Sequence, residues 1–365
     1  MSREERRLMR GMEKNRRRKN VPEREYLTQM RDSANVVEVE DLRAGFFTDA
    51  GRVRSVDGVS FCVPMGSIVG VVGESGCGKS VTSLSLMQLL PRPQGQITGG
   101  TIRLNLGDRA IDITQMPEEN MRHLRGKEIS MIFQEPMTTL NPVFPVGRQI
   151  EEVMEVHEGA VSTPEQRKSR TLELLNMVGI ANGEGVYAMY PHALSGGMRQ
   201  RVMIAMALAC DPKVIIADEP TTALDVTIQA QILEILKSLK EKMHSSILLI
   251  THDLGVVAGM ADFVVVMYAG RVVERGTVED IFYRPAHPYT VGLMASKPVV
   301  GKKTDKLYSI PGKVPNPVDM PDYCYFRDRC WDRWEKCEGA YPKMIPLSDT
   351  HYVSCYRKEG LKDVQ

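Results

Sequence analysis

The feature that most constrains this chain is a glycine-rich loop between an apolar run and a segment with helical periodicity. The loop fits the pattern G-x-x-x-x-G-K-[ST] and consists of Gly73, Glu74, Ser75, Gly76, Cys77, Gly78, Lys79 and Ser80. Residues 67–73 are typical of a buried strand, and residues 80–90 carry apolar side chains on one helical face. Nucleotide phosphates bind to this pattern in this strand–loop–helix context, and a chance match has odds of roughly one in a hundred.

The residue types in the loop suit a bound triphosphate. Glycines let backbone N–H groups approach phosphate oxygens, and the N-terminus of the following helix adds positive potential. Lys79 would neutralise the β- and γ-phosphates, and Ser80 would bind Mg²⁺. We therefore expect this loop to hold ATP together with Mg²⁺.

Two consecutive acids, Asp218 and Glu219, follow the apolar run 214–217. Such a run is typical of a parallel strand buried on both faces, and ligands bind beyond the carboxyl ends of such strands. We expect Asp218 to hold Mg²⁺ and Glu219 to polarise the attacking water as a general base. The alternative is a pair of solvated acids, which a phosphate loop in the same chain makes less favourable.

Strands and helices alternate along most of the 365 residues, which predicts an α/β fold with a parallel sheet. Strands are expected over 36–42, 53–63, 67–73, 128–133, 214–217, 247–250 and 262–268, and helices over 80–90, 149–157, 165–178, 197–210 and 227–243. We expect an antiparallel β-subdomain and a helical subdomain at about 136–193 to be carried by this core. The predicted domains are a basic N-terminal tail (1–35), the nucleotide-binding domain (36–296), and a linker with a small Cys-containing extension (297–365).

The N-terminal tail is the one strongly basic part of the chain. Residues 1–35 hold 11 Lys or Arg and 6 Asp or Glu, whereas the whole chain has a net charge of +1. One interpretation is a frayed, solvated tail, and the other is a contact with the phosphates of anionic lipid or RNA. The sequence does not decide between them.

The distribution of apolar residues indicates a cytosolic chain. No apolar run approaches the length of about 18 residues that a membrane-spanning helix needs, and the N-terminus lacks the apolar segment of a secretory signal. If the protein works at a membrane, partner subunits are expected to hold it there. A reducing compartment argues against disulfides between the seven cysteines.

A further motif begins at Leu194 and reads LSGGMRQR. It resembles the signature of ATP-binding-cassette proteins. Three further matches follow the family's order, namely Gln134 for the Q-loop, Ala223-Leu224-Asp225 for the D-loop and Thr251-His252-Asp253 for the switch histidine. The resemblance covers roughly residues 36–295.

The resemblance implies an ATPase in which Glu219, His252 and Gln134 are catalytic and Gln134 also approaches Mg²⁺. Its Ser195-Gly196-Gly197 segment opens a helix without bulky side chains and forms a second anion site. In the family, the signature of one subunit closes over ATP held by a partner, so two chains pair head to tail.

Two further ATP contacts follow from the resemblance. Asp225 is expected to take part in the site. Family members stack adenine on an aromatic residue before the phosphate loop, and Phe46 and Phe47 are the candidates, with core packing as the alternative.

The C-terminal part narrows the resemblance. The segments 284–290 and 311–315 resemble those of the ATPase subunits of dipeptide and oligopeptide importers. In those subunits, four cysteines hold an iron–sulfur cluster, which implies the same role for Cys324, Cys330, Cys337 and Cys355. This chain departs from the pattern at Tyr323, where relatives often have glycine.

The cysteine spacing itself leaves alternatives open. The four residues are separated by 5, 6 and 17 others, without the tight C-x₂₋₄-C pair that is usual for zinc. A [4Fe–4S] cluster, also held by four thiolates, is the favoured interpretation. Zinc remains the alternative, with His351 as a substitute ligand.

The function that these features predict is ATP hydrolysis driving import of dipeptides or oligopeptides. The alternatives are a motor for nickel, glutathione or another small solute, and a non-transport ATPase. The expected partners are a second ATPase subunit of the same or another kind, two transmembrane permease subunits and, indirectly, an extracytoplasmic substrate-binding protein. No nucleic acid is expected, and the chain should lie peripherally on the cytoplasmic face of the cell membrane.

Overall fold

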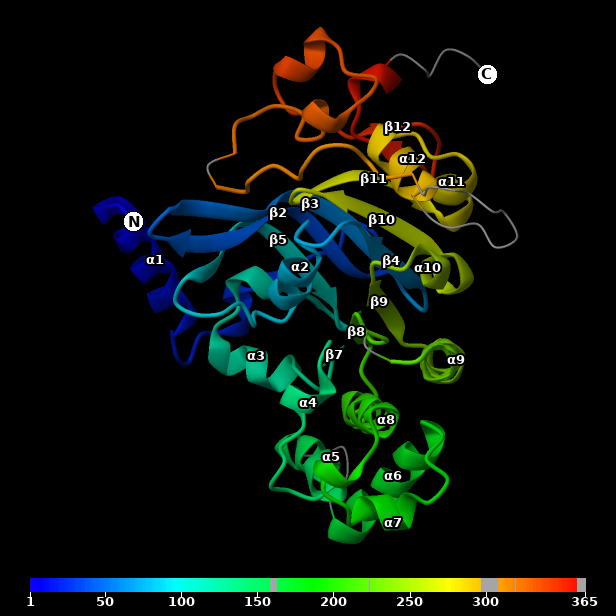
Figure 1. The fold of residues 1–365 in the computed structure, drawn as a ribbon. Coiled ribbons are helices and arrows are strands. Elements are labelled where there is room, and N and C mark those ends of the chain that lie inside the picture. Colours follow the sequence, from blue (N-terminus) through cyan, green and yellow to red (C-terminus); the bar gives the residue numbers. More distant parts are fainter. Residues whose placement is uncertain (158–162, 223, 297–307, 319, 360–365) are drawn as a thin grey trace.

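The computed structural model describes residues 1–157, 163–222, 224–296, 308–318 and 320–359, and its centre is a mixed sheet (Figure 1). The strand order is β12-β13-β11-β10-β4-β9-β8-β7. The strands are β4 (Ile68–Val72), β7 (Ile129–Ile132), β8 (Val214–Asp218), β9 (Ser246–Ile250), β10 (Phe263–Tyr268), β11 (Arg271–Thr277), β12 (Ile345–Pro346) and β13 (Tyr352–Val353). Strands β10, β4, β9, β8 and β7 pair in parallel, which confirms the predicted parallel sheet.

A second sheet is antiparallel and has the order β1-β6-β5-β2-β3. The strands are β1 (Leu27–Thr28), β2 (Asn35–Thr48), β3 (Gly51–Pro64), β5 (Gly95–Asn105) and β6 (Ala110–Asp112). It forms the predicted antiparallel β-subdomain, with β2 and β3 as a long hairpin. Strands β5 and β6 were not expected, because the glycines of β5 interrupt the apolar alternation.

Helices cover the sheets and form a separate group below them in Figure 1. The helices are α1 (Arg3–Arg16), α2 (Lys79–Leu86), α3 (Glu118–Leu124), α4 (Pro136–Thr139), α5 (Val146–Val156), α6 (Pro164–Met177), α7 (Gly183–Tyr187), α8 (Gly196–Ala207), α9 (Val226–Met243), α10 (Leu254–Met260), α11 (Val278–Tyr283) and α12 (Pro288–Ala295). Helix α2 contacts β2 and β3 of one sheet and β8 of the other, so it lies between them. Helices α4 to α7 make up the predicted helical insertion, and α8 connects it to β7.

The parallel strands are buried because both of their faces are covered. Every residue of β4, β8 and β9 is buried, as the uninterrupted apolar runs predicted. One apolar cluster fills the space around α2, and a second joins the sheet to the helical insertion. This packing fixes the carboxyl ends of the strands, where the site lies.

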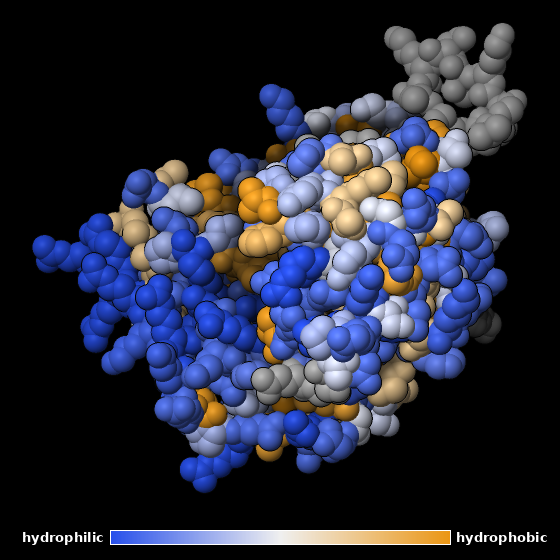
Figure 2. All heavy atoms as spheres, turned by 90° about the horizontal axis from the view of Figure 1, so that it is seen from below, coloured by the Kyte–Doolittle hydropathy of each residue, from blue (hydrophilic) through white to orange (hydrophobic). Residues whose placement is uncertain are grey.

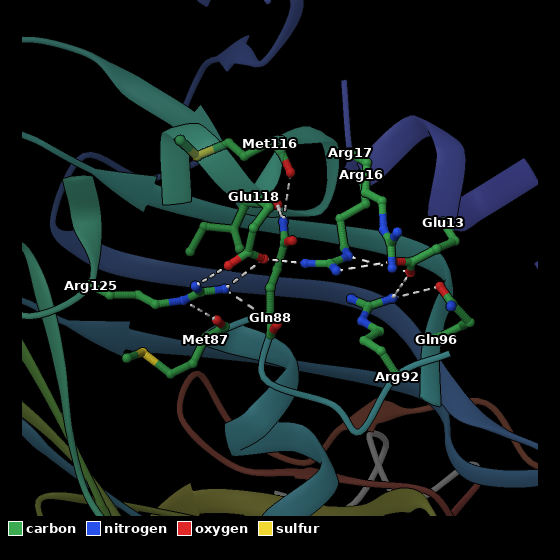
Figure 3. A network of polar contacts seen from close by, with 11 residues as sticks. Glu13, Arg16, Arg17, Met87, Gln88, Arg92, Gln96, Met116, Glu118 and Arg125 are labelled. Atoms are coloured by element: carbon green, nitrogen blue, oxygen red, sulfur yellow. Dashed lines mark hydrogen bonds and ion pairs between the residues drawn. The ribbon is translucent and has the colours of Figure 1, made fainter. Parts of the chain in front are cut away.

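The N-terminal segment is folded, which differs from the frayed tail considered above. Helix α1 begins with a capping box in which the Ser2 hydroxyl accepts from the Glu5 N–H at 3.1 Å. Near its other end, Arg16 donates to Glu118, and Arg125 donates to Glu118 at 2.7 Å (Figure 3). The Arg16–Glu118 pair joins residues 102 positions apart, so local composition could not reveal it.

The exposed side of α1 stays hydrophilic. None of its residues is buried, and the surface on the side of the molecule where it lies is covered by hydrophilic side chains (Figure 2). The alternative of a contact with anionic lipid or RNA stays a hypothesis. Among the helices of the described residues, none is both long and apolar enough to cross a bilayer.

The C-terminal extension packs against the predicted nucleotide-binding domain. Strand β13 pairs with β11, and the Tyr325 hydroxyl donates to Asp57 at 2.9 Å. Part of the predicted linker, 297–307, lies outside the described residues. Short 3-10 turns at Arg327–Arg329, Glu335–Glu338 and Tyr356–Lys358 form much of the remainder.

Candidate active site

A cleft of about 590 Å³ opens at the carboxyl ends of the parallel strands. It is lined by Ser55, Ser75, Gly76, Gly78, Lys79, Ser80, Val81, Gln134, Glu219 and His252. The strand order explains this grouping. The phosphate loop follows β4, His252 follows β9, the acids end β8, and Gln134 follows β7, and these four strands are neighbours in that order.

The loop backbone requires glycine at two positions. Gly73 and Gly78 have φ of +152° and +99°. A Cβ at Gly78 would lie against the Ser55 carbonyl oxygen. The Lys79 ammonium donates to the carbonyl oxygens of Gly73 at 2.8 Å and Glu74 at 3.1 Å, so its positive charge is held inside the loop.

Asp218 lies beside the start of α2. Its carboxylate accepts from the Ser80 hydroxyl at 3.3 Å and from the Ser83 hydroxyl at 2.9 Å. Burial raises the pKa of Asp218, and the two hydroxyl groups oppose that shift. Hydroxyl and carboxylate oxygens are ligands that Mg²⁺ prefers, so Ser80 and Asp218 form a donor set that fits this ion.

Glu219 stands where the three side chains expected to be catalytic meet. Its Oε2 is 3.2 Å from Gln134 Nε2 and 3.4 Å from His252 Nδ1, and it also accepts from the Thr222 hydroxyl at 2.9 Å. Its φ of +48° lies in the left-handed region, and its N–H donates to Ile250 O at 2.8 Å. A non-glycine residue held in this conformation is often functional.

The signature lies apart from this cleft. The Ser195 hydroxyl caps α8 by accepting from the Met198 N–H at 3.3 Å, and Gly196 and Gly197 form the first turn of that helix. None of these signature residues is among those that line the cleft. The two anion sites expected from the sequence therefore lie in separate places on the chain.

Asp225 caps α9, because its side chain accepts from the Ile228 N–H at 3.0 Å. It also lies outside the cleft lining. Ala223 of the same expected motif lies outside the described residues.

The two candidate aromatic residues for adenine lie in the β2 strand. Phe47 is only 2% exposed, and the Arg52 guanidinium lies 5.7 Å from its ring centre. Phe46 packs against the core cluster around α2. Neither phenylalanine lines the cleft. Both positions therefore agree with the alternative that the two side chains serve core packing.

The four cysteines of the extension lie close enough to influence one another's pKa. Burial raises the pKa of Cys324 to about 12 and that of Cys330 to about 11, and the neighbouring thiols add to both shifts. Within the described part of the chain, no group of three or more His, Cys, Asp or Glu residues is arranged to hold a metal ion. His351, considered as a zinc ligand, instead contacts Glu274 at 2.7 Å.

Several residues of the site were not expected from the sequence. Ser83 is one helical turn from Ser80, so helical spacing could have indicated its contact with Asp218. Tyr289 accepts from the Glu74 N–H at 2.8 Å across 215 positions, and no local pattern predicts such a contact.

Family models match two parts of the chain. One, described as ABC transporter, matches residues 56–222. The other, described as oligopeptide/dipeptide transporter, C-terminal region, matches residues 273–337. The second match includes three of the four cysteines of the extension.

Curated relatives are similar over nearly their whole length. The oligopeptide transport ATP-binding protein AppD of Bacillus subtilis is 50% identical over 329 residues, which is 90% of this chain and 98% of that protein. The dipeptide transport ATP-binding protein DppD of the same organism is 48% identical over 324 residues, or 89% and 95% of the two chains.

A solved structure shares the fold of the core. The ATP-binding cassette MJ0796, in a dimeric post-hydrolysis state bound to ADP and Pi, is 26% identical with a TM-score of 0.59. The match covers 66% of this chain and 98% of that one. These similarities and the motifs in the cleft show that the chain belongs to the ATP-binding-cassette transporter family, among the ATP-binding proteins of oligopeptide and dipeptide transporters.

Proposed function

We propose that this chain is the ATP-hydrolysing subunit of an importer of dipeptides or oligopeptides, bound peripherally to the cytoplasmic face of the cell membrane. The observation that carries the proposal is the meeting of Lys79, Gln134, Glu219 and His252 at one cleft. The peptide cargo rests on the curated relatives named for oligopeptide and dipeptide transport. Nickel, glutathione and other small solutes are the alternative cargoes.

Phosphate binding follows from the loop. Gly78, Lys79 and Ser80 at the start of α2 line the cleft, so their backbone N–H groups would approach phosphate oxygens, and Lys79 would supply the positive charge for the β- and γ-phosphates. Ser80 and Asp218 would hold Mg²⁺, and Gln134, which also lines the cleft, would be a further ligand. When bound, Mg²⁺ neutralises charge that develops on the phosphate oxygens.

The hydrolytic step is assigned to Glu219. Its carboxylate would accept the proton of the attacking water as that water bonds to the γ-phosphorus, and ADP leaves with the electrons of the broken P–O bond. Gln134 and His252 contact the same carboxylate oxygen, so both can orient Glu219 and the water. The strained backbone at Glu219 aims its side chain into the cleft.

Dimerisation would complete the site. The signature at Ser195, Gly196 and Gly197 is a helix N-terminus free of bulky side chains, and it lies outside the chain's own cleft. Head-to-tail pairing, with the same or another ATPase subunit, would bring this anion site onto ATP held by the partner. Asp225, at the start of α9, would then lie at the same interface.

The permease subunits would dock beside the Q-loop. A groove of about 490 Å³ lies between β7, α5 and α8, and apolar side chains such as Phe133, Val153 and Met203 line it. Because Gln134 directly follows Phe133, a permease loop in this groove would be coupled to the catalytic cleft. Two permease subunits, and through them a substrate-binding protein, are the proposed partners.

The Glu219→Gln variant should retain ATP binding and lose hydrolysis. The amide preserves shape but cannot accept the proton, so ATPase turnover should fall about 10²- to 10⁴-fold. Turnover is measured in the assembly with its permease partners, and Glu241→Gln, an exposed acid on α9, is the matched control. A Glu219→Gln chain that folds but binds no ATP would show that Glu219 has a structural role instead.

The Ser195→Arg variant should act across the dimer. A bulky cation would block the signature, while the variant's own phosphate loop stays intact. Isolated chains should bind ATP normally, and turnover of the assembly should fall about tenfold or more, as for loss of a charge-assisted hydrogen bond. Unchanged turnover in the assembly would contradict head-to-tail completion of the site.

We also propose that Cys324, Cys330, Cys337 and Cys355 hold a [4Fe–4S] cluster, with zinc as the alternative. Four thiolates are the donor set of such a cluster, and the effect of Cys330, Cys337 and Cys355 on the pKa of Cys324 supports a shared site. Because these side chains are not arranged around a metal position in the described part of the chain, binding would require them to turn toward one another. An extension of this size has too little core to fold alone, so a cluster would stabilise it.

Metal analysis tests this second proposal. Chains purified without oxygen should be coloured and contain about four iron and four sulfide atoms per chain. Cys337→Ser should lose them, whereas Cys210→Ser, outside the extension, should retain them. A colourless chain with one zinc and no sulfide would replace the cluster by zinc, and a chain without either metal would contradict both.

A further inference from the structure

The C-terminal extension reaches the phosphate loop through an ion pair. The Arg329 guanidinium contacts both carboxylate oxygens of Glu74, with Nη1–Oε2 at 2.8 Å and Nη2–Oε1 at 3.1 Å. The two residues are 255 positions apart. The Arg329 side chain is only 6% exposed, whereas that of Glu74 is 28% exposed. Such a bidentate arrangement is among the strongest contacts that an arginine makes.

The Arg329 guanidinium is also held by contacts other than Glu74. Its Nε donates to Pro311 O at 3.0 Å, and its Nη2 donates to Ile310 O at 3.3 Å. Its Nη1 also lies 3.4 Å from the Tyr268 hydroxyl at the end of β10. The guanidinium is therefore held in one plane by the segment before the extension and by the central sheet.

The loop backbone is held at the same residue. The Glu74 N–H donates to the Tyr289 hydroxyl at 2.8 Å. The Phe326 ring of the extension packs on Tyr289, with ring centres 5.5 Å apart, and on Tyr268, at 5.2 Å. Both the backbone and the side chain of Glu74 are thus supported by a surface that the extension helps to build.

The charge of Glu74 is unfavourable at an anion site. Glu74 is the second residue of a loop that binds a triphosphate, and a free carboxylate there would repel the phosphates. Glu74 is not among the residues lining the cleft, and its side chain is turned to Arg329. Arg329 therefore both neutralises this charge and keeps it out of the cleft.

We propose that Arg329 is a positioning residue for ATP binding, through which the C-terminal extension sets the affinity of the phosphate loop for ATP. It acts through Glu74 and does not touch the nucleotide. This inference rests on the proposed ATPase function and adds a device for controlling it. The phosphate loop binds ATP more tightly while Arg329 of the extension contacts Glu74, and loss of this contact weakens ATP binding.

The test is calorimetric titration of the purified full chain with Mg-ATP. Arg329→Gln should weaken binding about 3- to 30-fold, because the charge of Glu74 is left uncompensated beside the phosphates. Arg327→Gln is the matched control, since Arg327 pairs with Glu338 inside the same extension. Adding Glu74→Gln to Arg329→Gln should restore most of the affinity, which a simple loss of stability would not do.

A second pair of variants leaves Arg329 in place. Glu74→Asp keeps the charge but shortens the reach to Arg329, so it should weaken ATP binding more than Glu74→Gln, which removes the charge. Unchanged affinity in Arg329→Gln, or the absence of rescue by Glu74→Gln, would overturn the inference. A wild-type chain that binds no Mg-ATP would instead contradict the proposed function on which the inference rests.

Discussion

Parallel pairing of β4, β9 and β8 is the constraint on which the rest of the structure depends. Every residue in these strands is buried, and β8 matches β9 from Val214 to Asp218 without interruption. A shift by one residue would turn each side chain to the opposite face of the sheet, so dense packing on both faces fixes the register. That register places the phosphate loop, the two acids and His252 together at the carboxyl ends of the strands.

A strained backbone and oppositely charged side chains lie close together in the cleft. The left-handed backbone at Glu219 costs about 1–3 kcal/mol, and hydrogen bonds from its N–H to Ile250 O and from Thr222 to its carboxylate hold it there. Lys79 bonds to its own loop carbonyls, which keeps the ammonium close to where phosphates would bind. Local strain and charge are thus held in place by the rigid sheet.

The sequence predicted the central fold because its signals are local. An apolar run, a glycine loop and a helix around Lys79 can be recognised without neighbours, and the acids after β8 depend on the same pattern. The packing of α1 against the rest of the chain could not be predicted, because it depends on Arg16 meeting Glu118, 102 positions away. The contact between Arg329 and Glu74 was missed for the same reason, and the burial of Phe47 depends on how the β2–β3 hairpin packs.

Binding of ATP through the phosphate loop of the cleft can be measured by calorimetric titration of Mg-ATP into the purified full chain and into Lys79→Ala. Wild-type chain should bind one nucleotide, and Lys79→Ala should bind it about tenfold or more weakly, because a charge-assisted contact is lost. Lys213→Ala, an exposed lysine paired with Glu128, should bind as the wild type does. Equal affinity in the wild-type and Lys79→Ala chains, or no binding by the wild type, would show that the phosphate loop does not bind ATP in this way.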